Sequence, residues 1–113
     1  MKTSFEMTQA LIDQYGRING DNDIIHYDHD YAVKRGFRGT LAHGMHVMGC
    51  AVDLAAREYG PAFFRGGEVS VKWIAPVCPG DLLEVELGPD GTVTATVPSG
   101  KAMIGEAHAG RVG

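Results

Sequence analysis

Residues 41–59 read LAHGMHVMGCAVDLAAREY, and this stretch decides the fold class of the chain. Its apolar side chains cover nearly the whole circumference of a helix, which is typical of a helix in the interior of a protein. The small residues Gly49, Cys50 and Ala51 would let another layer approach the helix backbone closely. The glycine–proline pair at 60–61 predicts the end of the helix. We therefore expect a long buried helix over residues 41–59.

The part of the chain after this helix is typical of an antiparallel β-sheet. Residues 68–73 alternate polar and apolar side chains, as half-buried strands do. Pro-Gly-Asp, Pro-Asp-Gly and Ser-Gly turns separate the segments that follow. The expected strands cover residues 68–73, 82–87, 92–97 and 102–112. Helices first and strands afterwards predict an α+β domain, in which an antiparallel β-sheet wraps around a long central α-helix.

Two shorter helical segments are predicted ahead of the long helix. The first covers residues 8–19, with Thr8 as its N-cap. Gly20 follows as the left-handed residue that ends it. A helical turn over residues 31–35 ends at Gly36. The apolar face of the first helix is expected to comprise Met7, Leu11, Tyr15 and Ile18.

The composition describes one globular domain over residues 1–113. Hydrophobic residues make up 44% of the chain and charged residues 21%, which excludes a disordered or fibrous protein. The net charge of -4 argues against a general nucleic-acid binder. No stretch approaches the ~18 apolar residues of a membrane span, and no secretory signal is recognisable. Two cysteines make no disulfide framework. We expect a cytoplasmic protein with no nucleic-acid or membrane partner.

The candidate catalytic residues lie in two segments, one before and one after the helical turn predicted over residues 31–35. Asp21 and His26 lie in the segment GDNDIIH at residues 20–26, an irregular loop after a helix. A carboxylate and an imidazole can move a proton or polarise a water molecule. Gly44 lies at the start of the long helix, where backbone N–H groups can stabilise a developing oxyanion. Together these groups are suited to adding water to an acyl thioester, or removing it.

These motifs resemble the MaoC-like, (R)-specific enoyl-thioester hydratases and dehydratases of the hotdog fold. Residues 20–26 follow the family pattern Gly-Asp-x-Asn-Pro-(Ile/Leu)-His. Residues 42–45 match the Ala-His-Gly-Met that opens the family's central helix, and residues 76–81 match its Pro-Val-x-x-Gly-Asp signature. The chain departs from the pattern at Asp23 and Ile24, where the family has Asn and Pro.

The resemblance implies a hydro-lyase. The expected reaction is (R)-specific hydration of a trans-2-enoyl-CoA, or of a carrier-bound enoyl group, or the reverse dehydration of a 3-hydroxyacyl thioester. The resemblance implies catalytic roles for Asp21, His26 and Gly44. It implies a homodimer or a dimer of dimers, and no cofactor beyond the CoA or phosphopantetheine of the substrate. Expected substrate-binding residues are Asp23, His43, Met45 and Val52.

Two alternatives stay open at this point. A thioesterase of the same fold would direct the water at the thioester carbonyl, and a non-catalytic module would only bind an acyl group or dimerise. Fold alone does not decide among them. Asp23 keeps both open, as does Val52, which stands where some members of the family have a serine that lines the pocket.

Several other side chains have a structural explanation. Two His-x-x-His spacings, at residues 26–29 and 43–46, raise the question of a zinc site, because histidine is a common zinc ligand. No cysteine joins either pair, and we expect no metal. The basic group Lys34, Arg35 and Arg38 is interpreted as a solvated surface in preference to a phosphate site. We interpret Tyr31, Phe37 and Trp73 as packing residues in preference to ligand contacts.

Overall fold

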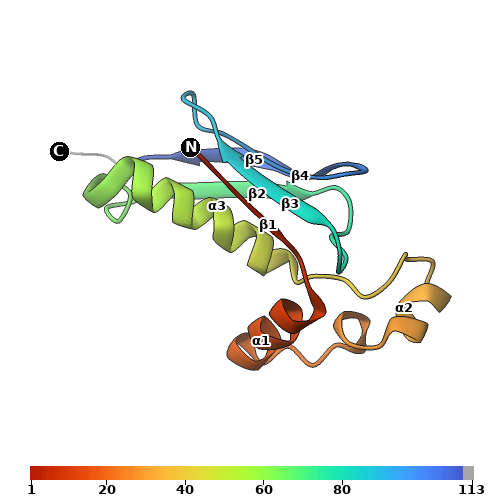
Figure 1. The fold of residues 1–113 in the computed structure, drawn as a ribbon. Coiled ribbons are helices and arrows are strands. Elements are labelled where there is room, and N and C mark those ends of the chain that lie inside the picture. Colours follow the sequence, from red (N-terminus) through yellow and green to blue (C-terminus); the bar gives the residue numbers. More distant parts are fainter. Residues whose placement is uncertain (111–113) are drawn as a thin grey trace.

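The computed structural model describes residues 1–110, which form a five-stranded antiparallel sheet with one long helix along one face. The smaller helices α1 and α2 lie together beyond one end of the sheet, near the start of α3 (Figure 1). The expected α+β architecture is confirmed. The elements are β1 (Lys2–Glu6), α1 (Gln9–Asn19), η1 (Ile24–His26), α2 (His29–Lys34), α3 (Gly44–Tyr59), η2 (Gly60–Ala62), β2 (Glu68–Trp73), β3 (Leu82–Leu87), β4 (Thr92–Val97) and β5 (Gly100–His108).

The strands follow the order β1-β3-β4-β5-β2, and every neighbouring pair is antiparallel. Strand β1 was not predicted from the sequence. Its partly buried residue Phe5 pairs with the buried Leu83 of β3. Strand β5 ends at His108 and not at residue 112; positions 111–112 of that prediction lie outside the described residues.

Helix α3 begins at Gly44, three residues later than predicted, because residues 41–43 are not helical and His43, with an extended backbone, is the N-cap. Its buried residues are Val47, Ala51, Leu54 and Ala55, and they join the sheet's apolar face in one core. The prediction that α3 is buried all round is wrong, since Met45 is 56% exposed. A single sheet contacts only one side of the helix. Among residues 1–110, no helix has the length and apolarity needed to cross a membrane.

Helix α1 has the predicted ends. The Thr8 side chain accepts a hydrogen bond from the Leu11 N–H, and Gly20 ends the helix with a φ of 77°. Its predicted apolar face is wrong in part, because Ile12 is buried whereas Ile18 is 77% exposed. The helix lies beyond the end of the sheet (Figure 1), and its buried residues are Ile12 and Gly16.

Helix α2 starts two residues earlier than predicted. The side chain of Asp28 accepts a hydrogen bond from the Tyr31 N–H and so caps a helix that begins at His29. Gly36 follows the helix with a φ of 94°, as expected for the residue that reverses the chain there.

An ion pair joins the loop before α3 to the turn before β3. Both oxygens of the buried Asp81 carboxylate accept hydrogen bonds from Arg38, at 3.1 and 2.9 Å. The Cys78 N–H donates a third bond to Asp81. Burial alone would raise the pKa of Asp81, but these bonds outweigh burial and the pKa is lowered. Arg38 is therefore a structural residue and not merely part of a solvated surface.

Replacing Arg38 by Met tests this ion pair. We expect the free energy of unfolding to fall by about 1–3 kcal/mol, because two charge-assisted hydrogen bonds are lost and a buried carboxylate keeps only one donor. Unfolding in urea measures this change in the free energy of unfolding. The Arg57→Met variant is the control: Arg57 pairs with Asp53 on the exposed side of α3, and about 0.5 kcal/mol or less should be lost.

The effect of Arg38 should depend on pH in one direction. A lowered folded-state pKa stabilises the protein above the unfolded value, about 3.9 for an aspartate, and this contribution is lost as pH falls through the folded value. The stability gap between the wild type and Arg38→Met should therefore narrow below about pH 4. A gap that is unchanged from pH 7 to pH 3 would contradict an ionic origin.

Candidate active site

Asp21 and His26 are held by a compact turn between α1 and α2. The Asp23 N–H donates to the Asp21 carboxylate at 2.9 Å. The Asp23 carboxylate accepts from the Ile25 N–H at 3.1 Å and caps η1, whose last residue is His26. The short polar side chains after Gly20 thus form local hydrogen bonds to the backbone. The turn brings the two candidate catalytic side chains to the same place.

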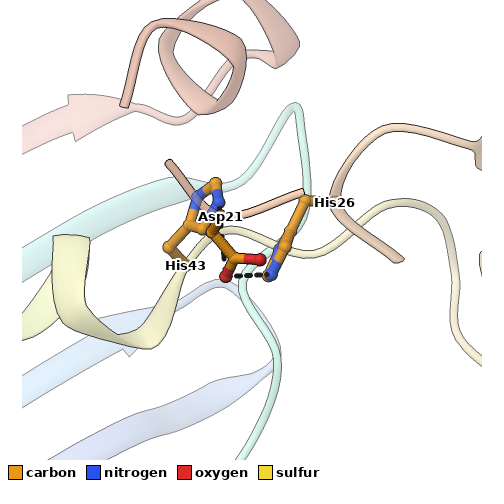
Figure 2. Close-up of side chains that lie close together, drawn as sticks. All are labelled: Asp21, His26 and His43. Carbon is orange, nitrogen blue, oxygen red and sulfur yellow. Dashed lines mark ion pairs between the residues drawn. The ribbon is translucent and has the colours of Figure 1, made fainter. Parts of the chain in front are cut away.

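The ring of His26 is oriented by the backbone of the next loop. Its Nδ1 lies 2.7 Å from the carbonyl oxygen of Leu41. A carbonyl can only accept, so Nδ1 carries the proton and Nε2 keeps its lone pair when the ring is neutral. Nε2 lies 3.3 Å from Oδ2 of Asp21, as Figure 2 shows. Two acceptors therefore lie in contact, and a proton donor placed beside them can form a hydrogen bond with each.

The Asp21 carboxylate is stabilised in its ionised form. The hydrogen bond from the Asp23 N–H is the main cause that lowers the pKa of Asp21, and the nearby His26 and His43 add to it. A carboxylate and an imidazole nitrogen side by side can accept the two protons of one water molecule. The water oxygen is then free to act as a nucleophile.

His43 lies directly behind this pair. Its ring is buried and stacks on His26, with centroids 3.9 Å apart and planes at 22°. Its Nε2 lies 3.9 Å from Oδ2 of Asp21 and 3.3 Å from the hydroxyl of Tyr27. Burial, together with the charge that His26 can carry, lowers the pKa of His43, which favours its neutral form.

Asp21, His26 and His43 are also the residues here that could hold a metal ion. One ligand atom from each lies within 4.8 Å of the others. In stacked rings, however, the nitrogen lone pairs run side by side and do not converge on one point, as shared coordination requires. The arrangement favours hydrogen bonding over metal binding.

Gly44 supplies a backbone donor next to the pair. Its N–H is the first of helix α3 and has no acceptor among residues 1–110. The indole of Trp73 packs on Gly44 and donates a hydrogen bond to its carbonyl oxygen at 2.9 Å. A Cβ at position 44 would lie 2.9 Å from the indole ring. The close approach of Trp73 therefore requires glycine here.

An apolar cavity of about 370 Å³ opens where these groups meet. His26 and Gly44 border it, so the imidazole and the start of α3 face the same space. Phe37 and Trp73, interpreted from the sequence as packing residues, also border it. Residues that line the cavity include His26, Phe37, Gly44, Val47, Trp73 and Ile74.

The four predicted substrate-binding residues do not line this cavity. His43 stacks on His26, Asp23 caps η1, the Met45 side chain is exposed, and Val52 lies half-buried on α3. Their substrate-binding roles stay predictions. Sequence reasoning overlooked Tyr27, whose hydroxyl reaches both Asp21 and His43. The only sequence signal for Tyr27 was its position directly after His26.

Comparison with known proteins places the chain in a family. The sequence pattern described as the MaoC like domain matches residues 1–103. The chain belongs to the MaoC-like dehydratase family. It is 32% identical over 99 residues to the peroxisomal multifunctional enzyme type 2 of Drosophila melanogaster. That match covers 81% of this chain but only 16% of the relative, so this MaoC-like chain spans a small part of that protein's length.

Solved structures show the fold of this MaoC-like chain. The unliganded R-hydratase PhaJ1 from Pseudomonas aeruginosa superposes with a TM-score of 0.75 at 22% identity, covering 99% of this chain and 80% of that one. The ChsH1-ChsH2 complex from Mycobacterium tuberculosis gives a TM-score of 0.78 at 15% identity, with coverages of 98% and 94%. The hotdog fold is confirmed.

Substitution of Gly44 tests the geometry around α3. In Gly44→Ala the new methyl group should displace the indole, break its hydrogen bond and cost about 0.5–1.5 kcal/mol of stability. Trp73 is the only tryptophan, so its fluorescence reports the change directly, and we expect emission at longer wavelength and stronger quenching by acrylamide. Gly49→Ala is the control on the same helix, since nothing lies within 4 Å of a Cβ there. Equal spectra for both variants would contradict this packing.

Proposed function

We propose that the chain catalyses the hydration of a trans-2-enoyl thioester to an (R)-3-hydroxyacyl thioester, or the reverse dehydration. One observation carries the proposal: His26, which pairs with Asp21, and Gly44, the first residue of α3, border the same apolar cavity. The family and the similar (R)-hydratase support the reaction class and its stereochemistry.

The thioester carbonyl accepts a hydrogen bond from the Gly44 N–H. This donor lies at the positive end of the α3 dipole, and negative charge that develops on the carbonyl oxygen is stabilised there. Withdrawal of electrons through the carbonyl makes C3 of the conjugated double bond electrophilic. The apolar lining of the cavity suits the acyl chain.

The water molecule is held by the pair of acceptors. It donates one proton toward Oδ2 of Asp21 and the other toward Nε2 of His26, while its oxygen forms a bond with C3. Nε2 takes up one proton, since the lowered pKa makes the Asp21 carboxylate the weaker base. The imidazolium then returns this proton to C2 of the enolate on the same face. The elements of water are thus added syn, and dehydration follows the same steps in reverse.

The test of this function is incubation with crotonyl-CoA. Loss of the enoyl absorbance without release of free thiol indicates hydration, whereas free thiol indicates the alternative thioesterase. Asp21→Asn and His26→Gln should each lower the hydration rate by ~10²-fold or more. Asn replaces the ionised carboxylate by a neutral amide, and Gln has no group that takes up the proton of the water. His108→Gln and Asp53→Asn are the matched controls, since both side chains lie on exposed surfaces away from the cavity.

The outcome of these assays decides among the candidates. Near-normal turnover in both the Asp21→Asn and the His26→Gln variants, when folded, would contradict the proposed mechanism. A wild type that neither hydrates nor hydrolyses enoyl thioesters, yet binds an acyl-CoA, would favour the non-catalytic module.

We also propose that two copies of the chain associate as a homodimer. Trp73 and Ile74, at the cavity, are 47% and 51% exposed, and Met45 on α3 is 56% exposed. The outer strands β1 and β2 each leave one edge without a partner strand among the described residues. A second copy would cover such apolar groups and edges. Sedimentation at micromolar concentration should give twice the chain mass; an active monomer would contradict this.

A further inference from the structure

Helix α1 contains a glycine where a helix does not favour one. Gly16 lies in the last turns of α1, away from its cap, and glycine is second only to proline in disfavouring a helix interior. Gly16 is buried, and a Cβ at this position would overlap the hydroxyl of Tyr27. All three atoms nearest to that Cβ belong to the Tyr27 side chain. The glycine thus leaves room for one particular tyrosine.

The Tyr27 hydroxyl makes two contacts within the active site. It donates its single proton to the main-chain carbonyl of Asp21 at 2.5 Å. It must therefore act as the acceptor in its 3.3 Å contact with Nε2 of His43. The neutral His43 ring consequently carries its proton on Nε2, and Nδ1 is unprotonated. Nδ1 of His43 is buried without a hydrogen-bond partner among residues 1–110, so the Tyr27 contact alone assigns this tautomer.

We propose that Tyr27, seated against Gly16, is a positioning residue that holds the Asp21 carboxylate opposite His26. One hydrogen bond fixes the backbone of Asp21, and the other fixes His43, the ring on which His26 stacks. Tyr27 does not line the apolar cavity, so it acts through these residues and not on the acyl group. The proposal rests on the hydratase function for its kinetic tests and on geometry for its spectroscopic test.

The first test replaces Tyr27 by Phe. With crotonyl-CoA as substrate, we expect kcat to fall roughly tenfold, the loss that one or two neutral hydrogen bonds account for. KM should stay within about twofold, because the cavity is untouched. Tyr31→Phe is the matched control. It removes a hydroxyl whose one hydrogen-bond partner among residues 1–110 is Arg35, the C-cap of α2, and both constants should be unchanged. Wild-type kcat in Tyr27→Phe would overturn the proposal.

The second test keeps Tyr27 and fills the space at Gly16 that its hydroxyl occupies. In Gly16→Ala the Tyr27 ring must move as a whole, because the new methyl group would overlap its hydroxyl, while the helix gains a better helix-forming residue. We expect Tm to be unchanged or higher while kcat falls to the level of Tyr27→Phe. The double variant Gly16→Ala/Tyr27→Phe should lose no more kcat than either single variant, because both substitutions remove the same contacts. Full activity in Gly16→Ala would overturn the proposal.

The third test does not depend on catalysis. Two-bond 1H–15N NMR spectra of the histidine rings at neutral pH should show His26 protonated on Nδ1 and His43 on Nε2. The His43 signals should move in Tyr27→Phe and stay in Tyr31→Phe. If crotonyl-CoA is not hydrated but these tautomers are present, the hydratase function fails and the positioning role stands. A His43 proton on Nδ1 overturns the positioning role whatever the activity.

Discussion

The backbone of residues 41 and 42 is the point on which the active site depends. The Leu41 N–H donates to the carbonyl of Ile25 in η1, and the Leu41 carbonyl accepts from the His26 ring. The Ala42 N–H donates to the carbonyl of Val77, in the segment that follows β2. Two residues later helix α3 begins. The same short extended segment therefore fixes the tautomer of the base and the position of the Gly44 N–H.

Asp21 and His26 lie in two different environments, which suits the ionised carboxylate and the base of the proposed mechanism. The His26 side chain is 12% exposed and borders the apolar cavity, whereas the Asp21 side chain is 39% exposed. Asp21 borders a second, polar hollow together with Asp13, Arg17 and Tyr27. A carboxylate that keeps contact with solvent is ionised at little cost, while full burial would penalise the charge. The imidazole on the apolar side can then exchange a proton with a bound substrate.

The parts of this structure that depend on local chemistry could be predicted from the sequence. The Thr8 and Gly20 caps, the long helix and three of the strands follow from short-range patterns. What was missed depends on contacts between distant segments. Strand β1 is stabilised by pairing with residues about eighty positions later, and its own residues carry little strand signal. The role of Tyr27 depends on the space at Gly16, which no pattern within the loop reveals.

The two departures from the family motif are explained by the turn itself. The family's Asn would cap η1 with its side-chain oxygen, and the Asp23 carboxylate accepts the same kind of bond from the Ile25 N–H. The family's Pro would occupy the first position of the short helix, where the backbone N–H has no partner within the helix. Ile24 occupies that position here, and the 3-10 turn forms all the same. The capping bond keeps the Asp23 carboxylate on the backbone of η1, while its N–H holds Asp21. The turn is therefore held here without the family's Asn and Pro, and Asp23 adds a negative charge beside Asp21.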